Sequence, residues 1–141
     1  MLISDKINNL IPKAMEAIRE VGIANGQNEV AKEFEGYIAS FGPNIIQSGL
    51  LPTLIFFHNT SGKKKDSSLW LKSIRYVMSN GAEMSNLIEY VITHCRQQTV
   101  DRNEYQLADM NQAKLNAMEK EISLIVAALK LAVRTFIIKE E

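Results

Sequence analysis

The sequence predicts an all-α protein, a single compact bundle of about six helices that ends in a long C-terminal helix. Every long segment places its apolar residues at helical spacing, and none shows the alternation that is typical of a strand. Glycine and proline divide the first part of the chain into shorter segments, but neither occurs after Gly81. The 141 residues contain no repeat or linker, so we expect one all-helical domain over residues 1–141.

The first predicted helix begins near the N-terminus, where Ser4 or Asp5 can cap it. Gly22 and the Asn25-Gly26 dipeptide are expected to end it. Pro12 lies inside the pattern, so it either kinks the helix or marks its true first turn. One apolar face of this helix contains Ile7, Leu10, Ile11, Ala14, Ile18 and Val21.

The next helix is predicted to break at Phe41-Gly42-Pro43, after which a short helix leads into Gly49. Pro52 can open the following helix, because its missing N–H would be unpaired there. The segment from Leu54 to Phe57 has no polar face, so we expect it to run through the middle of the core. The apolar stripe of the helix before the break contains Val30, Phe34, Tyr37, Ile38 and Phe41.

Residues 59–67 are polar and like-charged, which predicts a loop, and the helix that follows should end at Asn80-Gly81. Asp101 and Glu104 resemble a capping box that would start a last helix of roughly 35 residues, or about 50 Å. The inward residues of the last three helices are Trp70, Leu71, Ile74, Val77 and Met78; then Met84, Leu87, Ile88, Val91, Ile92 and Cys95; and finally Leu115, Met118, Ile122, Ile125, Leu129, Ala132 and Phe136.

The composition is that of an ordinary soluble globular protein, with 46% hydrophobic and 23% charged residues. The single cysteine, Cys95, excludes an internal disulfide framework and fits a reducing cytoplasm. No apolar run reaches the roughly 18 residues of a membrane span, and the N-terminus has no pattern of a signal peptide. We therefore expect a cytoplasmic protein without membrane contact.

Metal and catalytic motifs are not found in the sequence. Neither His58 nor His94 has a glutamate three residues before it, as helix-borne di-iron sites require. Cys95 falls on an apolar stripe, where burial would raise its thiol pKa and make it inert. No Gly-x-Ser-x-Gly elbow or phosphate-binding glycine loop occurs. We therefore predict a protein that is not an enzyme and has no cofactor or metal, although a small helical nuclease stays open as an alternative.

Basic residues gather in the middle of a chain whose net charge is zero. Residues 61–100 contain six bases and three acids, whereas both flanking parts contain more acids than bases. Such bases can solubilise a surface, or they can meet phosphates and give a salt-dependent affinity without sequence preference. The candidate nucleic-acid-binding residues are Lys63, Lys64, Lys65, Lys72, Arg75, Arg96 and Arg102.

Residues 34–57 resemble the signature of a known family. Tyr37 is followed by Pro43, Ile46, the turn Gln47-Ser48-Gly49-Leu50 and the helix Thr53-Leu54-Ile55-Phe56. This order is similar to that of the small subunit of the Cmr-type (type III-B) CRISPR RNA-guided effector complex. In that family Asn is usual where Ser48 stands, and Ala is usual where Ile55 stands.

The resemblance implies an all-helical, non-catalytic, RNA-binding subunit in antiviral defence. Its partners would be the other Cmr effector subunits, further copies of itself, and guide and target RNA. The basic residues would hold a guide–target duplex through its backbone and leave sequence recognition to base pairing, while neighbouring subunits cleave. The alternative from another class is a helical protein–protein adaptor without an RNA role.

Overall fold

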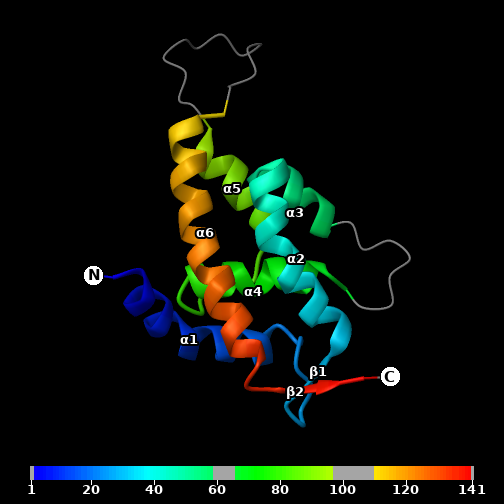
Figure 1. Ribbon diagram of the computed structural model, residues 1–141. Coiled ribbons are helices and arrows are strands. Elements are labelled where there is room, and N and C mark those ends of the chain that lie inside the picture. The colour runs from blue at the N-terminus through cyan, green and yellow to red at the C-terminus, as the bar shows by residue number, and fades with distance from the viewer. Residues whose placement is uncertain (1, 59–65, 97–109, 141) are drawn as a thin grey trace.

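The computed structural model describes residues 2–58, 66–96 and 110–140, and it confirms an all-α bundle with a long C-terminal helix (Figure 1). The helices among these residues are α1 (Ile3–Glu20), α2 (Lys32–Ser48), α3 (Leu50–His58), α4 (Ser68–Met78), α5 (Leu87–Cys95) and α6 (Gln112–Val133), and the strands are β1 (Glu29–Ala31) and β2 (Ile137–Lys139).

Helix α6 lies at the centre of the arrangement and packs against α1, α2, α4 and α5. Figure 1 shows α6 along the length of the molecule, with α1 against its C-terminal half and α5 beside its first turns. Helix α3 follows α2 after a tight turn at Gly49, whose φ of 88° is one that glycine adopts without strain. None of the helices among the described residues is both long and apolar enough to cross a membrane.

The core is continuous and contains residues from all six helices. Trp70, at its centre, is fully buried, and its indole N–H donates to the carbonyl oxygen of Phe34 at 2.9 Å. The two rings also meet edge to face, with 6.2 Å between their centroids. A buried Trp needs such an acceptor, so this pair joins α4 to the start of α2.

The expectation that the chain contains no strand is wrong in one detail. Strands β1 and β2 pair in parallel, with Val30 opposite Ile138, and so bring the C-terminal segment next to residues more than a hundred positions earlier. Each strand has only three residues, which is too short for a recognisable alternation. Val30, which was predicted to lie on a helix, therefore lies in a strand.

Two predicted helix boundaries, the cap at Ser4 or Asp5 and the break at Pro43, are also wrong. Helix α1 starts at Ile3 without a side-chain cap, so Ser4 and Asp5 lie inside it, and Pro12 lies well within the helix rather than in its first turn. Helix α2 continues through Pro43 instead of breaking there. Phe41 and Ile45, on either side of that proline, are both buried, so tertiary packing outweighs the local cost of proline.

The last helix is shorter than predicted. The proposed cap at Asp101 lies outside the described residues, but Met110 forms an isolated bridge with Arg96, so a helix cannot run unbroken from Asp101. Helix α6 instead starts at Gln112, where the Asn111 side chain accepts from the Lys114 N–H at 3.0 Å. It ends at Val133, so Phe136 is buried beyond the helix rather than on it.

Candidate nucleic-acid interface

Two of the predicted RNA-binding residues, Lys72 and Arg75, lie one turn apart on α4. The Lys72 side chain is exposed and has no ion-pair or hydrogen-bond partner among the described residues. Arg75 is different, because only 11% of its side chain is exposed and its Nη2 atom lies 2.7 Å from Oε2 of Glu83. Lys72 can therefore approach a phosphate directly, whereas the charge of Arg75 is partly compensated within the protein.

Aromatic contacts also hold the Arg75 guanidinium in place. Its central carbon lies 4.0 Å from the centroid of the Tyr90 ring, and the His94 ring lies at 4.0 Å from the same ring. A cation held over an aromatic face in this way is stabilised by about 0.5–2 kcal/mol. This contact joins α4 to α5, a structural role that helical spacing alone does not predict for Arg75. The Arg75 Nε atom is buried and has no hydrogen-bond partner in the part of the chain that the structure describes.

Arg96 caps the C-terminal end of α5 and is exposed. Its segment is tied to the start of α6, since the Asn111 N–H donates to the Cys95 carbonyl oxygen at 2.7 Å. Arg96 thus stands on an ordered part of the chain, at the end of α5 opposite to its cap at Asn86. The remaining predicted residues, Lys63, Lys64, Lys65 and Arg102, lie outside the described residues.

An exposed apolar face on α3 contradicts the expectation that this helix is buried throughout. Leu54 and Phe57 point into the core, but Ile55 is 57% exposed and Phe56 is 61% exposed. Pro52, one turn before them, is also exposed. These three residues share one side of α3 at helical spacing, and we call them the α3 apolar face. Sequence analysis missed this face because a helix without polar residues looks the same whether it is buried by its own chain or by a partner.

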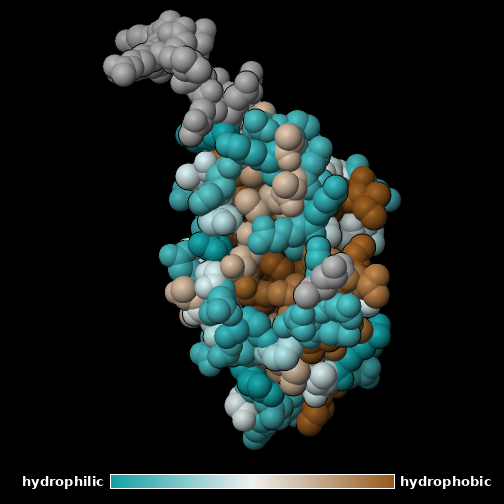
Figure 2. All heavy atoms as spheres, turned by 90° about the vertical axis from the view of Figure 1, so that its left-hand side faces the viewer, coloured by the Kyte–Doolittle hydropathy of each residue, from teal (hydrophilic) through white to brown (hydrophobic). Residues whose placement is uncertain are grey.

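A second apolar surface lies between the start of α1 and the middle of α6. A hollow of about 770 Å³ opens there, and Ile3 and Leu124 contribute apolar side chains to it, while Lys6, Lys120 and Glu119 add charges. Figure 2 shows this side of the molecule, where hydrophobic atoms are visible inside a hollow surrounded by mostly hydrophilic surface (Figure 2). Ile3 is 66% exposed.

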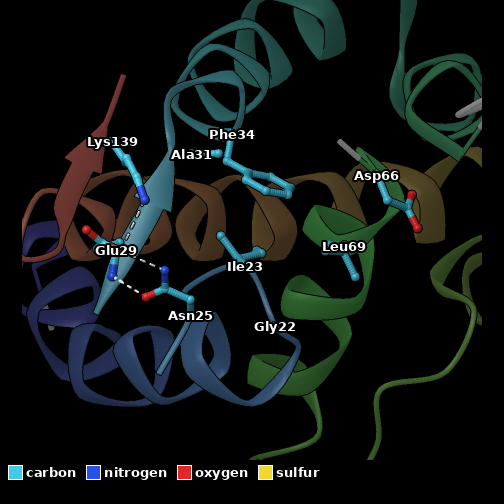
Figure 3. A pocket seen from close by; sticks show the side chains of 9 residues that line it. All are labelled: Gly22, Ile23, Asn25, Glu29, Ala31, Phe34, Asp66, Leu69 and Lys139. Atoms are coloured by element: carbon cyan, nitrogen blue, oxygen red, sulfur yellow. Dashed lines mark hydrogen bonds and ion pairs between the residues drawn. The ribbon is translucent and has the colours of Figure 1, made fainter. Parts of the chain in front are cut away.

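The pocket in Figure 3, of about 370 Å³, lies between β1, β2 and the start of α4 (Figure 3). Glu29, on one side, accepts from the Asn25 amide at 2.8 Å and lies 3.8 Å from the Lys139 ammonium. Asp66, on the other side, accepts from the N–H and the hydroxyl of Ser68. The side chains of Ile23 and Phe34 lie between the two carboxylates. Each acid is thus engaged separately, and the two do not form the close pair that acid–base catalysis uses.

Other reactive groups are not gathered into a site. Among residues 2–58, 66–96 and 110–140, no group of three or more His, Cys, Asp or Glu side chains is placed to hold a metal ion. Cys95 is fully buried, and this burial raises the pKa of its thiol above the ordinary value. The thiol is therefore protonated near neutral pH and is a poor nucleophile.

Comparison with known proteins identifies a family. The model of a protein family described as "CRISPR-associated protein (Cas_Cmr5)" matches residues 9–119, which is most of the chain. No curated protein and no solved structure matches. The matched range begins in α1 and ends in α6, so it includes α2 to α5 in full and parts of α1 and α6.

Proposed function

The chain belongs to the CRISPR-associated Cmr5 family, and from this membership we propose a specific role in the type III-B effector complex. It acts as a non-catalytic small subunit that helps to hold guide and target RNA and to build the subunit filament. The complex works in the cytoplasm in antiviral defence, and the reactions that cleave nucleic acid belong to other subunits. The family match over residues 9–119 is the observation that carries this proposal.

The RNA contact is electrostatic. Lys72 on α4 and Arg96 at the C-terminal end of α5 are exposed cations, and residues 61–100 contain six bases and three acids. Cations of this kind neutralise phosphates without recognising bases, which suits a subunit that works beside a guide strand. The same contact includes the candidate residues Lys63, Lys64, Lys65 and Arg102. Arg75 contributes less, because Glu83 compensates part of its charge.

The protein partners are the other Cmr subunits and further copies of this chain. The α3 apolar face and the hollow between α1 and α6 supply surfaces for them, because contiguous exposed apolar side chains often mark a site of protein–protein contact. Two separate apolar surfaces allow one subunit to contact two neighbours, as a filament requires.

A salt titration tests the RNA contact. Single-stranded or duplex RNA should bind the chain, alone or with partner subunits, with an affinity that falls linearly on logarithmic axes as salt increases. The double substitution of Lys63→Glu with Lys72→Glu should abolish this binding at ~50 mM salt. Lys72 is preferred to Arg75 here, because changing Arg75 would also disturb its contacts with Glu83 and Tyr90.

A protein–protein adaptor without an RNA role is the second candidate function. It is favoured by one observation, the exposed Ile55 and Phe56 on α3, which present an apolar surface rather than a charged one. If RNA does not associate at ~50 mM salt with the chain or with its purified complex, while partner subunits still bind, the adaptor function replaces the RNA-holding function.

A further inference from the structure

A hollow of about 250 Å³ lies where α3, α4 and the start of α5 meet. His58 at the end of α3 lines it together with Lys72 of α4. Ser85 and Asn86, at the start of α5, line another side, and Ser68 of α4 adds a hydroxyl group. Two buried leucines complete the lining, so these polar side chains surround an apolar base.

Two lining side chains, those of His58 and Lys72, can donate to an anion through nitrogen. Both side chains are exposed, and neither has a hydrogen-bond or ion-pair partner among the described residues. Two acids contact the lining: Asp66 accepts two hydrogen bonds from Ser68, and Glu83 is paired with Arg75 and accepts from the Ser85 hydroxyl at 3.4 Å. The Ser68 and Ser85 hydroxyls of the lining thus already donate to these acids, which leaves His58 and Lys72 as the lining side chains without a partner among the described residues.

The amino end of α5 adds to this preference for an anion. Asn86 caps the helix, since its side chain accepts from the Ile88 N–H at 2.9 Å, and both Asn86 and Leu87 line the hollow. The partial positive charge at the start of a helix favours an anion at this position. The cap, the ammonium group and the imidazole thus come from three different helices and face one cavity.

We propose that this hollow binds one phosphodiester group of RNA, with Lys72 forming the ion pair and the His58 ring donating a hydrogen bond. The inference rests on the proposed RNA-holding function and specifies one of its contacts. Binding of a single phosphate here carries no base specificity. His58 is thereby an RNA-contacting residue that was not among the candidates from the sequence.

The two histidines allow a direct test, because the chain contains only His58 and His94. Imidazole proton resonances of the full chain are followed by NMR while a short oligouridylate is added, and His58→Gln assigns its signal by loss. The His58 signal is expected to shift with RNA, whereas His94, stacked on Tyr90, stays in place. A shift confined to His94, or no shift of His58 at saturating oligouridylate, overturns the proposal.

Binding measurements separate this inference from the proposed function. His58→Gln and Lys72→Met should each weaken oligouridylate binding, and Lys72→Met should lower the salt slope by about 0.7, as expected for one phosphate on a single strand. Lys130 is an exposed lysine on α6, and Lys130→Met should leave the RNA affinity and the salt slope unchanged. If the wild-type chain and its complex bind no RNA, the proposed function fails. If they bind RNA and both variants bind it with the affinity of the wild type, only the site at this hollow is wrong. The site is also wrong if the variants lose partner subunits but keep their RNA affinity.

Discussion

The guanidinium of Arg75 is paired with the carboxylate of Glu83, at 2.7 Å between Nη2 and Oε2. These two residues come from α4 and from the turn that follows it, so the ion pair closes the connection to α5. An arginine held in this way contributes to the stability of the fold, and it offers less charge to a phosphate than an exposed lysine. The pair therefore divides the basic residues of α4 into a structural one, Arg75, and a free one, Lys72.

Replacing Glu83 by glutamine should increase RNA binding. The substitution removes the negative charge that compensates Arg75, so RNA affinity should rise roughly two- to fivefold at low salt, in line with a surface ion pair worth up to ~1 kcal/mol. Fluorescence anisotropy with labelled RNA measures the change. Glu89→Gln, which removes an exposed acid elsewhere in the same region, is the matched control for net charge. An equal rise in both variants would mean that Glu83 has no special relation to Arg75.

Arg75 and Lys72 should differ in their effect on stability. Arg75→Met loses the contact with the Tyr90 ring and the pairing with Glu83, so the free energy of unfolding should fall by about 1–2 kcal/mol. Lys72→Met should stay within ~0.5 kcal/mol of the wild type, because its side chain is exposed and unpaired. Urea unfolding followed by circular dichroism compares the two. Equal stabilities would contradict the structural role of Arg75.

Trp70→Phe should destabilise the core because it removes one buried hydrogen bond. Phenylalanine keeps most of the apolar volume, but the Phe34 carbonyl oxygen loses its buried donor, which costs about 1–3 kcal/mol. Circular dichroism must follow the urea transition, since Trp70 is the only tryptophan in the chain. Unchanged stability would show that water or another donor satisfies that carbonyl oxygen.

The α3 apolar face should be needed for assembly rather than for folding. Ile55→Ser combined with Phe56→Ser should reduce the partner subunits that co-purify with the chain roughly tenfold or more, because burying one such side chain is worth about 1.5–3 kcal/mol. Leu131→Ser, at a residue of α6 that is 42% exposed, is the control for loss of an exposed apolar side chain. Full assembly of the double variant with an unchanged fold would remove α3 from the partner interface.

The buried thiol should report the unfolding of the whole domain. Since burial raises the pKa of Cys95, the native thiol should resist a disulfide reagent at mildly alkaline pH and react fully in urea. The folded state also holds the thiol proton of Cys95 more tightly than the unfolded state does. The free energy of unfolding should therefore fall as the pH rises above the thiol's ordinary pKa of 9.0, because the unfolded state then loses this proton first. Cys95→Ala should reduce that alkaline loss. Rapid labelling of the native protein would contradict the burial.

Helical spacing predicted most of the fold. The inward faces of α4 and α6 are correct because Trp70, Ile74, Ile122 and Leu129 repeat at steps that fit one side of a helix. The sheet could not be predicted, since Ile137–Lys139 gains its strand structure only from pairing with a segment far away in the chain. Pro43 was misjudged for a related reason, because the burial on either side of it is a tertiary effect.

The candidate interface was predictable only as a set of charges. Counting bases found Lys72 and Arg96, which are exposed, but it could not separate them from Arg75, whose partners Glu83 and Tyr90 lie on later segments. The exposure of Ile55 and Phe56 was also hidden, because an apolar sequence does not tell which molecule will cover it. Both features depend on how helices pack, and local pattern contains no such information.

Purification of the tagged chain from cells that express the whole effector complex tests the central claim most directly. The account predicts that the other Cmr subunits and RNA elute with it, and that RNA is retained less well when Lys63 and Lys72 are both replaced by glutamate. Elution of the chain with protein partners but without RNA, or of the chain alone, would contradict it.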